Sequence, residues 1–253
     1  MQYNLNMVKF LISILRLVGK AIKIIRINSD PLFKHKISYI ENNSIITRYS
    51  KQEIFESYHY FKKFFSSSVL FYSKEELLLH ALKTSFKNNK DNLGLYLEFG
   101  VWTGKSINFL SNKYPLIKFY GFDSFFGLSE DWLGRESHPK NTFNLNGTPP
   151  EVNKNVELVI GEIKDTLHDF LINKNSKIDF IHIDVDTYES TKLILNHVKN
   201  SLSKKAIIVF DELHNIPGWR QGEFRALEEV FFERKYKFIS FSNSTNAAIM
   251  MED

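Results

Sequence analysis

The stretch "FIHIDVDTYEST", residues 180–191, joins a run of apolar residues to a polar segment, and this junction decides the fold class. The apolar half is typical of a buried β-strand, and the polar half leads into an amphipathic helix. Asp184 and Asp186 stand between the two. Because a carboxylate at the end of a buried strand is costly without a positive charge opposite, the sequence predicts a polar site at this strand end.

Five apolar strand segments follow residue 90, and four of them lead into a helical segment. The expected strands are 93–101, 119–124, 156–163, 177–186 and 205–213, and the expected helices are 104–114, 164–172, 188–202 and 221–235. Residues 236–253 are expected to form a hairpin. Near-continuous apolar strands alternating with helices indicate an α/β fold with a parallel sheet covered by helices on both faces.

The N-terminal part has a different character. We expect residues 1–90 to form a helical extension, with helices at 51–65 and 73–89, and residues 91–253 to form the α/β domain. Ser73 has the sequence context of an N-cap. Residues 8–25 form a basic amphipathic stretch, with four cations in one stripe. Two interpretations stay open: the stretch lies in a membrane interface, or it packs against the domain or a second subunit of a homo-oligomer.

Composition narrows the function classes. The chain has 253 residues, a formal net charge of +4 and no cysteine. The absence of cysteine excludes a disulfide scaffold, a cysteine zinc site and a thiol nucleophile. The sequence contains no long run of Lys and Arg residues, so it gives no indication of a nucleic-acid partner. We therefore expect a cytoplasmic protein, either free or peripheral at the inner face of the membrane.

The end of the first expected strand, "LEFGVWTGKS" (97–106), carries a turn with Gly100 and Gly104. Glycines allow a sharp turn and close approach to a ligand, and Thr103 and Ser106 add hydroxyl groups. The spacing matches neither the P-loop nor the dinucleotide fingerprint. Glu98 disfavours a phosphate and favours a ligand with an ammonium group. On glycine spacing alone, a plain strand-to-helix turn is the alternative.

Acidic residues follow the next two strands. Asp123 stands about twenty residues after the turn, where an acid holds a ribose diol in related folds, although it could simply cap the turn. Glu162 falls at the tip of the third strand, within reach of an adenine edge. The combination favours an adenosyl ligand with an amino-acid end and no pyrophosphate, and S-adenosylmethionine fits this description.

Three further carboxylates end the fourth and fifth strands: Asp184, Asp211 and Glu212. Grouped without a partner they would repel one another, and a hard divalent cation such as Mg²⁺ would relieve the conflict. Such an ion could hold a substrate hydroxyl beside a methyl donor. The alternative is that Lys or Arg neighbours pair these acids, or that some of them only cap helices.

The segment "HNIPGWRQGEF" (214–224) follows these acids. We expect Trp219 and Arg220 to contact the substrate, although packing of Trp219 into the core is nearly as plausible. Among the histidines, His214 lies nearest the expected metal site and is the best candidate for a general base. His182 alternates with apolar strand residues and is expected to be structural.

These motifs together resemble the macrocin O-methyltransferase family of class I S-adenosylmethionine-dependent methyltransferases. The resemblance rests on "LEFGVWTGKSINFLS", "YGFDSFFGLSEDW", "IDFIHIDVDTYEST" and "VFDELHNIPGWRQGEFRALEE", in this order. It implies a Rossmann-like sheet of seven strands with a reversed terminal hairpin, and metal-assisted methylation of a sugar hydroxyl. By motif, it implies donor-binding positions at Glu98, Gly100, Thr103, Ser106 and Asp123, and metal positions at Asp184, Asp211 and Glu212. Gly104 and Ser124, beside these positions, are further candidates for donor binding. The family usually has Asp where Glu212 stands.

The leading hypothesis is therefore a Mg²⁺-assisted O-methyltransferase acting on a sugar or a glycosylated small molecule, with Asp184 and His214 as catalytic residues. One alternative is an O-methyltransferase for catechol-like diols. Another is a non-catalytic module that binds S-adenosylmethionine. A nicotinamide-dependent dehydrogenase is the remaining rival.

Overall fold

The computed structural model describes residues 44–89, 94–134 and 138–252, so the amphipathic stretch 8–25 lies outside the described residues. Residues 52–253 form one compact unit. Of the preceding unit, residues 1–51, the structure describes only the start of helix α3 (Ile45–Phe65).

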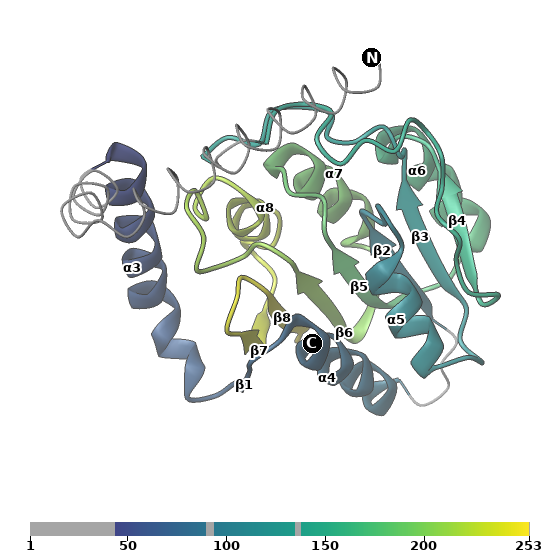
Figure 1. Ribbon diagram of the computed structural model, residues 1–253. Helices are drawn as coiled ribbons and strands as arrows, with labels where there is room; N and C mark the ends of the chain where they lie inside the picture. The colour runs from purple at the N-terminus through teal and green to yellow at the C-terminus, as the bar shows by residue number, and fades with distance from the viewer. Residues whose placement is uncertain (1–43, 90–93, 135–137, 253) are drawn as a thin grey trace, which may run out of the picture. The chain divides into compact units, whose positions relative to one another are not determined.

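A single sheet of eight strands organises the described residues (Figure 1). Its strands are β1 (Val69–Phe71), β2 (Leu95–Phe99), β3 (Phe119–Asp123), β4 (Val156–Ile160), β5 (Ile178–Ile183), β6 (Leu202–Phe210), β7 (Tyr236–Ser242) and β8 (Ala247–Met251). Their order across the sheet is β1-β7-β8-β6-β5-β2-β3-β4. Only β8 runs antiparallel to its neighbours, β6 and β7.

The helices connect these strands and cover both faces. They are α3, α4 (Lys74–Asn88), α5 (Lys105–Lys113), α6 (Ile163–Lys174), α7 (Tyr188–Val198) and α8 (Glu223–Val230). Leu77 of α4 and Ile107 of α5 belong to one buried cluster, whereas Phe61 of α3, Leu167 of α6 and Leu195 of α7 belong to the other. Neighbouring strand residues alternate between the clusters, as the two-residue period of a strand requires.

The fold prediction is confirmed, with one addition. The α/β class, the mostly parallel sheet and the C-terminal hairpin of β7 and β8 are all present. The eighth strand is β1, which pairs in parallel with β7 at the sheet edge. The compact unit begins at Gln52, so it includes β1 and α4, which precede residue 90. β1 extends the sheet, and α4 packs its apolar face against it.

Two local features follow directly from the sequence. Ser73 caps α4 with a complete capping box, because its side chain accepts a hydrogen bond from the Glu76 backbone N–H while the Glu76 carboxylate accepts one from the Ser73 N–H. The strand order reverses between β2 and β5, which are neighbours in the sheet but are followed by helices on opposite faces. Ligands of open α/β sheets bind beyond the carboxyl ends of strands at such a point.

Candidate active site

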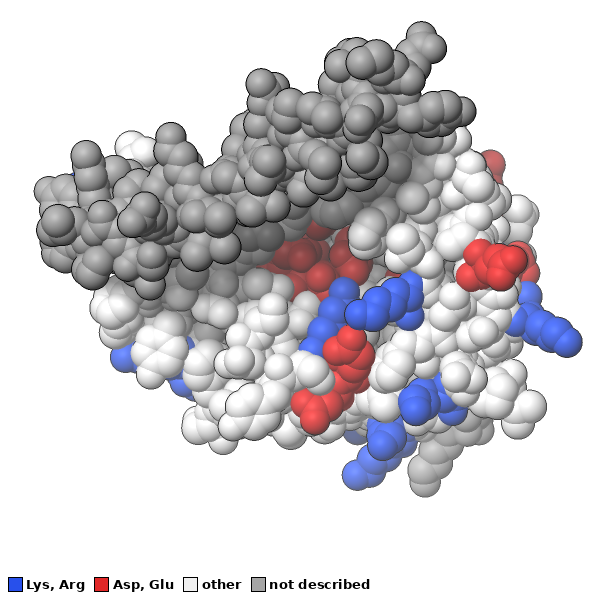
Figure 2. Space-filling view, in the orientation of Figure 1, with Lys and Arg blue, Asp and Glu red and all other residues white. Residues whose placement is uncertain are grey.

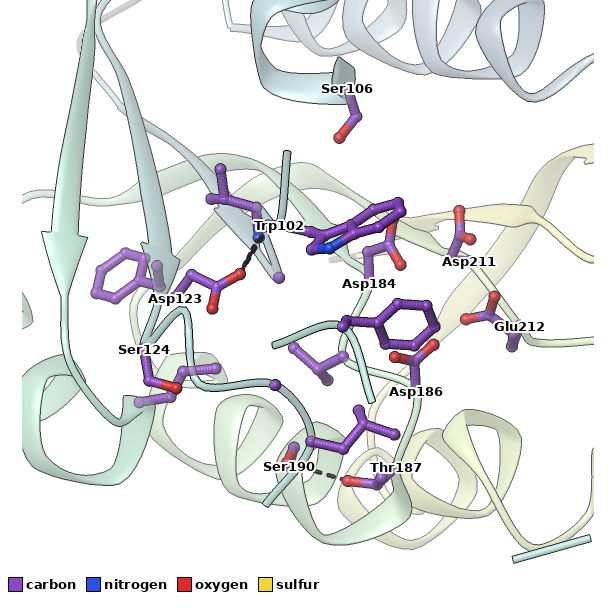
Figure 3. A pocket seen from close by; sticks show the side chains of 18 of the residues that line it. Trp102, Ser106, Asp123, Ser124, Asp184, Asp186, Thr187, Ser190, Asp211 and Glu212 are labelled. Atoms are coloured by element: carbon purple, nitrogen blue, oxygen red, sulfur yellow. Dashed lines mark hydrogen bonds between the residues drawn. The ribbon is translucent and has the colours of Figure 1, made fainter. Parts of the chain in front are cut away.

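A cavity of about 1250 Å³ lies beyond the carboxyl ends of β2, β3, β5 and β6. Figure 3 shows the pocket with Asp123 and Ser124 on one side and the carboxylates of residues 184, 186, 211 and 212 on the other. Figure 2 shows acidic side chains recessed in a hollow of the face in view. The structure brings nine predicted site residues together in the cavity wall: Gly100, Thr103, Ser106, Asp123, Ser124, Glu162, Asp184, Asp211 and Glu212.

The turn after β2 needs its first glycine for a steric reason. Gly100 has φ +84°, and a Cβ atom placed on it would lie 1.7 Å from the carbonyl oxygen of Asp184. The Gly100 N–H donates to the Phe122 carbonyl at 2.9 Å, so the turn is held between β3 and β5. Gly104 also has positive φ, +76°, and starts α5, but it is not part of the cavity wall.

Asp123 organises the turns on the donor side of the cavity. Its Oδ2 accepts hydrogen bonds from the backbone N–H groups of Val101 at 2.8 Å and Trp102 at 2.7 Å, and its Oδ1 accepts one from Phe125 at 2.7 Å. A carboxylate has about four acceptor positions, so this geometry leaves room for one further donor from a ligand. Asp123 therefore caps the turn, as the alternative interpretation expected, and still lines the cavity.

Glu98 does not reach the cavity, which corrects the expectation that it faces the donor's ammonium group. It is 2% exposed, and its two oxygens accept hydrogen bonds from Ser106 Oγ and His182 Nδ1, each at 2.9 Å. The reason is register, because Glu98 and His182 lie directly opposite in the parallel pair of β2 and β5. Burial opposes protonation of His182, but Asp211 and Glu98 outweigh it and raise the pKa to about 9. His182 is structural, as predicted.

The two strand-end aspartates share a lysine. Lys74 Nζ lies 2.8 Å from Asp184 Oδ2 and 2.5 Å from Asp211 Oδ1. Burial and the charge of Asp211 raise the pKa of Asp184 to about 6. Burial would raise the pKa of Asp211 too, but His182 and Lys74 outweigh it and hold the pKa below its ordinary value. The carboxylates of residues 184 and 211 converge as predicted, and the alternative of a pairing lysine also holds.

A second acidic group lies beside this pair. Asp184, Asp186 and Glu212 each offer a carboxylate oxygen, and these oxygens all lie within 4.8 Å of one another. Glu212 Oε2 is buried and has no hydrogen-bond partner among the described residues. Burial raises the pKa of Glu212 well above its ordinary value, and the negative charges of Asp211 and Glu223 raise it further. This donor set suits a hard divalent cation, which takes oxygen ligands.

The segment after β6 corrects three predictions. His214 is buried between Phe61 and Phe241, and its Nε2 lies 3.0 Å from the Asn246 carbonyl oxygen, so it is no base for the cavity. Burial lowers the pKa of His214 to about 4.

Trp219 and Arg220 also turn away from the cavity. Trp219 is 2% exposed and packs against Tyr60 and Phe61, so the core interpretation of this residue holds. Arg220 forms ion pairs with Glu53 and Glu56 of α3, which draw it away from the substrate side. The guanidinium group of Arg220 and the indole of Trp219 therefore hold this loop against α3.

Sequence reasoning missed several residues of the cavity wall. Lys74 comes from α4, outside the expected domain, and the sequence patterns assign no role to Asp186. Trp102 also lines the cavity, with φ +45° and 47% of its surface exposed, and its ring contacts that of Phe143 edge-on at 5.4 Å between centroids. A signal existed only for Asp186, which stands two residues after Asp184 at the same strand end.

Residues 97–213 match the model of a family described as a methyltransferase domain. This part of the chain is similar to methyltransferase domains. The match spans the glycine turn, Asp123 and the acidic strand ends, so it covers the cavity described above. The prediction of a methyltransferase is thereby confirmed.

Solved structures with the same fold include two methyltransferases. CalS11, a calicheamicin methyltransferase, aligns with a TM-score of 0.56 at 21% identity, over 89% of this chain and 95% of that chain. The O-methyltransferase NovP aligns with a TM-score of 0.54 at 17% identity, over 70% of this chain and 79% of that chain. No curated protein matches the chain. None of the helices in the described ranges is both long and apolar enough to span a bilayer.

Proposed function

We propose that this protein is an S-adenosylmethionine-dependent O-methyltransferase that methylates a hydroxyl group of a sugar or a glycosylated small molecule. The observation that carries the proposal is one cavity in which the Gly100 turn with Asp123 faces the carboxylates of β5 and β6. The methyltransferase domain matched by residues 97–213 supports the reaction class. The chain shares its fold with CalS11, a calicheamicin methyltransferase, and with the O-methyltransferase NovP. These neighbours support an oxygen atom as the methyl acceptor.

The donor would lie along the β2 and β3 ends. Asp123 would accept a hydrogen bond from a ribose hydroxyl, and Glu162 at the tip of β4 would stand beside the adenine. Thr103 and Ser106 would border the amino-acid end. The buried Glu98 would position Ser106, because its carboxylate accepts a hydrogen bond from the Ser106 hydroxyl at 2.9 Å.

The acceptor side would hold a divalent ion such as Mg²⁺. Asp184, Asp186 and Glu212 fit such an ion, because their oxygens converge and Glu212 Oε2 is buried without a partner in the described parts of the chain. When bound, the ion would supply Lewis-acid stabilisation of the acceptor oxygen as its proton leaves.

The chain's own residues would position the reactants and take the proton. The acceptor oxygen attacks the methyl carbon, the carbon–sulfur bond of the sulfonium breaks, and the thioether product keeps the bonding electrons. Because His214 faces away from the cavity, the hydroxyl proton would pass to a carboxylate of the cavity wall, Asp184 or Asp186. Most of the rate enhancement would come from holding the two reacting atoms in line.

The proposal is tested by labelled methyl transfer. Purified protein is incubated with methyl-labelled S-adenosylmethionine, Mg²⁺ and an extract of small glycosylated metabolites from the producing cells, and the products are analysed by mass spectrometry. We expect one or more sugar-containing products to gain a methyl group, and the signal to vanish with EDTA. Label on protein, on nucleic acid or on an amine would contradict the proposal.

A further inference from the structure

Lys74 stands in an unexpected place for a residue of the N-terminal half of the compact unit. It is the first residue of α4, directly after the N-cap Ser73, whose capping box fixes the start of the helix. From there its side chain enters the cavity wall and places Nζ between Asp184 and Asp211. Its side chain is only 29% exposed, and those of the two aspartates are 25% and 12% exposed.

Asp211 already has several partners within the protein, and its carboxylate contacts meet at one oxygen, Oδ1. Besides Lys74, its Oδ1 accepts a hydrogen bond from Asn246 Nδ2 at 2.7 Å and lies 3.6 Å from His182 Nε2. Its carbonyl oxygen accepts hydrogen bonds from Thr245 Oγ1 and Asn246 Nδ2. Three donors therefore converge on this aspartate, and its negative charge is compensated within the protein.

The neighbouring acids are in the opposite situation. Glu212 has a buried oxygen without a partner among the described residues, and its backbone N–H donates to another buried acid, Glu223, at 2.8 Å. The Glu212 side of the cluster thus keeps a carboxyl oxygen that no donor among the described residues contacts. The described residues contain two sets of converging ligand atoms, His182–Asp184–Asp211 and Asp184–Asp186–Glu212. Lys74 contacts both aspartates of the first set but only Asp184 of the second.

We propose that Lys74 is a resident cation that neutralises the Asp184–Asp211 pair in place of a divalent ion. The ammonium group thereby keeps Asp211 from acting as a metal ligand and confines the ion of the proposed function to Asp184, Asp186 and Glu212. The sequence resemblance implied Asp184, Asp211 and Glu212 instead, so the inference changes the ligand set. It rests on the proposed function only in assuming that the cluster binds a divalent ion.

The test measures binding of Mn²⁺ alone, by calorimetry, without donor or acceptor. Two like charges at close range repel each other strongly when partly shielded from water, so Lys74→Met should raise the Mn²⁺ affinity at least about tenfold. Adding Asp211→Asn to Lys74→Met should reverse the gain. The matched control is Lys105→Met, because Lys105 also lines the cavity but has an 85% exposed side chain and contacts neither aspartate.

A second pair of variants keeps the test decisive if Lys74→Met does not fold. In the otherwise unchanged protein, Asp211→Asn removes a nearby charge but no ligand, so it should weaken Mn²⁺ binding clearly less than Glu212→Gln, which should lower the affinity at least about tenfold. The proposal is overturned if Lys74→Met binds Mn²⁺ no more tightly than the parent, or if Asp211→Asn weakens binding as much as Glu212→Gln. Absence of methyl transfer would refute the proposed function while leaving the Mn²⁺ result intact.

Discussion

Gly100 and Asp184 meet where the donor side and the acidic side of the cavity join. The backbone of Gly100 lies so close to the Asp184 carbonyl that a Cβ atom on residue 100 would fall 1.7 Å from that oxygen. The Asp184 N–H also donates to the Phe99 carbonyl at 2.9 Å. The end of β2 is therefore fixed against the end of β5, and the turn that would hold the donor is registered to the carboxylate that would face the acceptor.

Gly100→Ala should damage both stability and donor binding. The substitution combines a positive φ with a clash against backbone, which cannot rotate away, and we expect a loss of about 3 kcal/mol or more in the free energy of unfolding. Urea denaturation measures this loss. Gly222→Ala is the matched control, because no heavy atom lies within 4 Å of a Cβ at Gly222. Equal stability of the two variants would contradict the close approach of the Gly100 backbone to the Asp184 carbonyl oxygen.

Asp123→Asn should weaken S-adenosylmethionine binding. An amide presents one oxygen where the carboxylate accepts three backbone hydrogen bonds, so the Val101–Trp102 turn and the Phe125 turn cannot both be held. Hydrogen bonds to a charged group contribute about 1.5–3 kcal/mol each, so we expect the Kd to rise at least about tenfold. Calorimetry measures the effect. Asp169→Asn, on the exposed face of α6, removes the same charge and should leave the Kd unchanged; a matching loss there would point to a general charge effect instead.

Asp184→Asn should abolish turnover and spare donor binding. The side chain lies in the acidic cluster, whereas the donor is expected along the β2 and β3 ends. We expect methyl transfer to fall at least about 100-fold, since positioning and charge stabilisation both depend on the cluster. The Kd for S-adenosylmethionine should change less than about threefold. Normal methylation by the variant would refute the role given to the strand-end acids.

The loop after β6 should behave as structure, not as substrate contact. Arg220→Gln removes ion pairs to Glu53 and Glu56 that are partly exposed, so it should cost at most about 1 kcal/mol of stability. Trp219→Ala empties a buried site and should cost about 3–5 kcal/mol. With Arg220→Gln, the KM for the acceptor should stay at the parent value. A large rise in the KM for the acceptor without a change in thermal stability would show that Arg220 contacts the substrate.

The sheet was predictable because its signals are local. Apolar strand runs, the glycine turn and the Ser73–Glu76 capping box each need only a few neighbouring residues, and all are found in the structure. The convergence of Asp184 and Asp211 was also predictable, since parallel neighbouring strands end at the same sheet edge.

Side-chain direction at the site was harder, because it depends on partners far away in sequence. Glu98 turns to His182, which register places opposite it, and Arg220 turns to acids about 165 residues earlier. Lys74 reaches Asp184 across a separation of 110 residues, from a helix that sequence assigned to the extension. Such pairings have no spacing signal in a single sequence. Only the folded sheet brings them together.

Calorimetric titration of the unmodified protein with S-adenosylmethionine and, separately, with NAD⁺ distinguishes a methyl-donor site from a dinucleotide site. A cavity that pairs the Asp123 turn with acidic strand ends, and that lacks a pyrophosphate-binding glycine pattern, should bind S-adenosylmethionine with one-to-one stoichiometry and give no heat with NAD⁺. Binding of NAD⁺ in preference to S-adenosylmethionine, or of neither, would contradict the account.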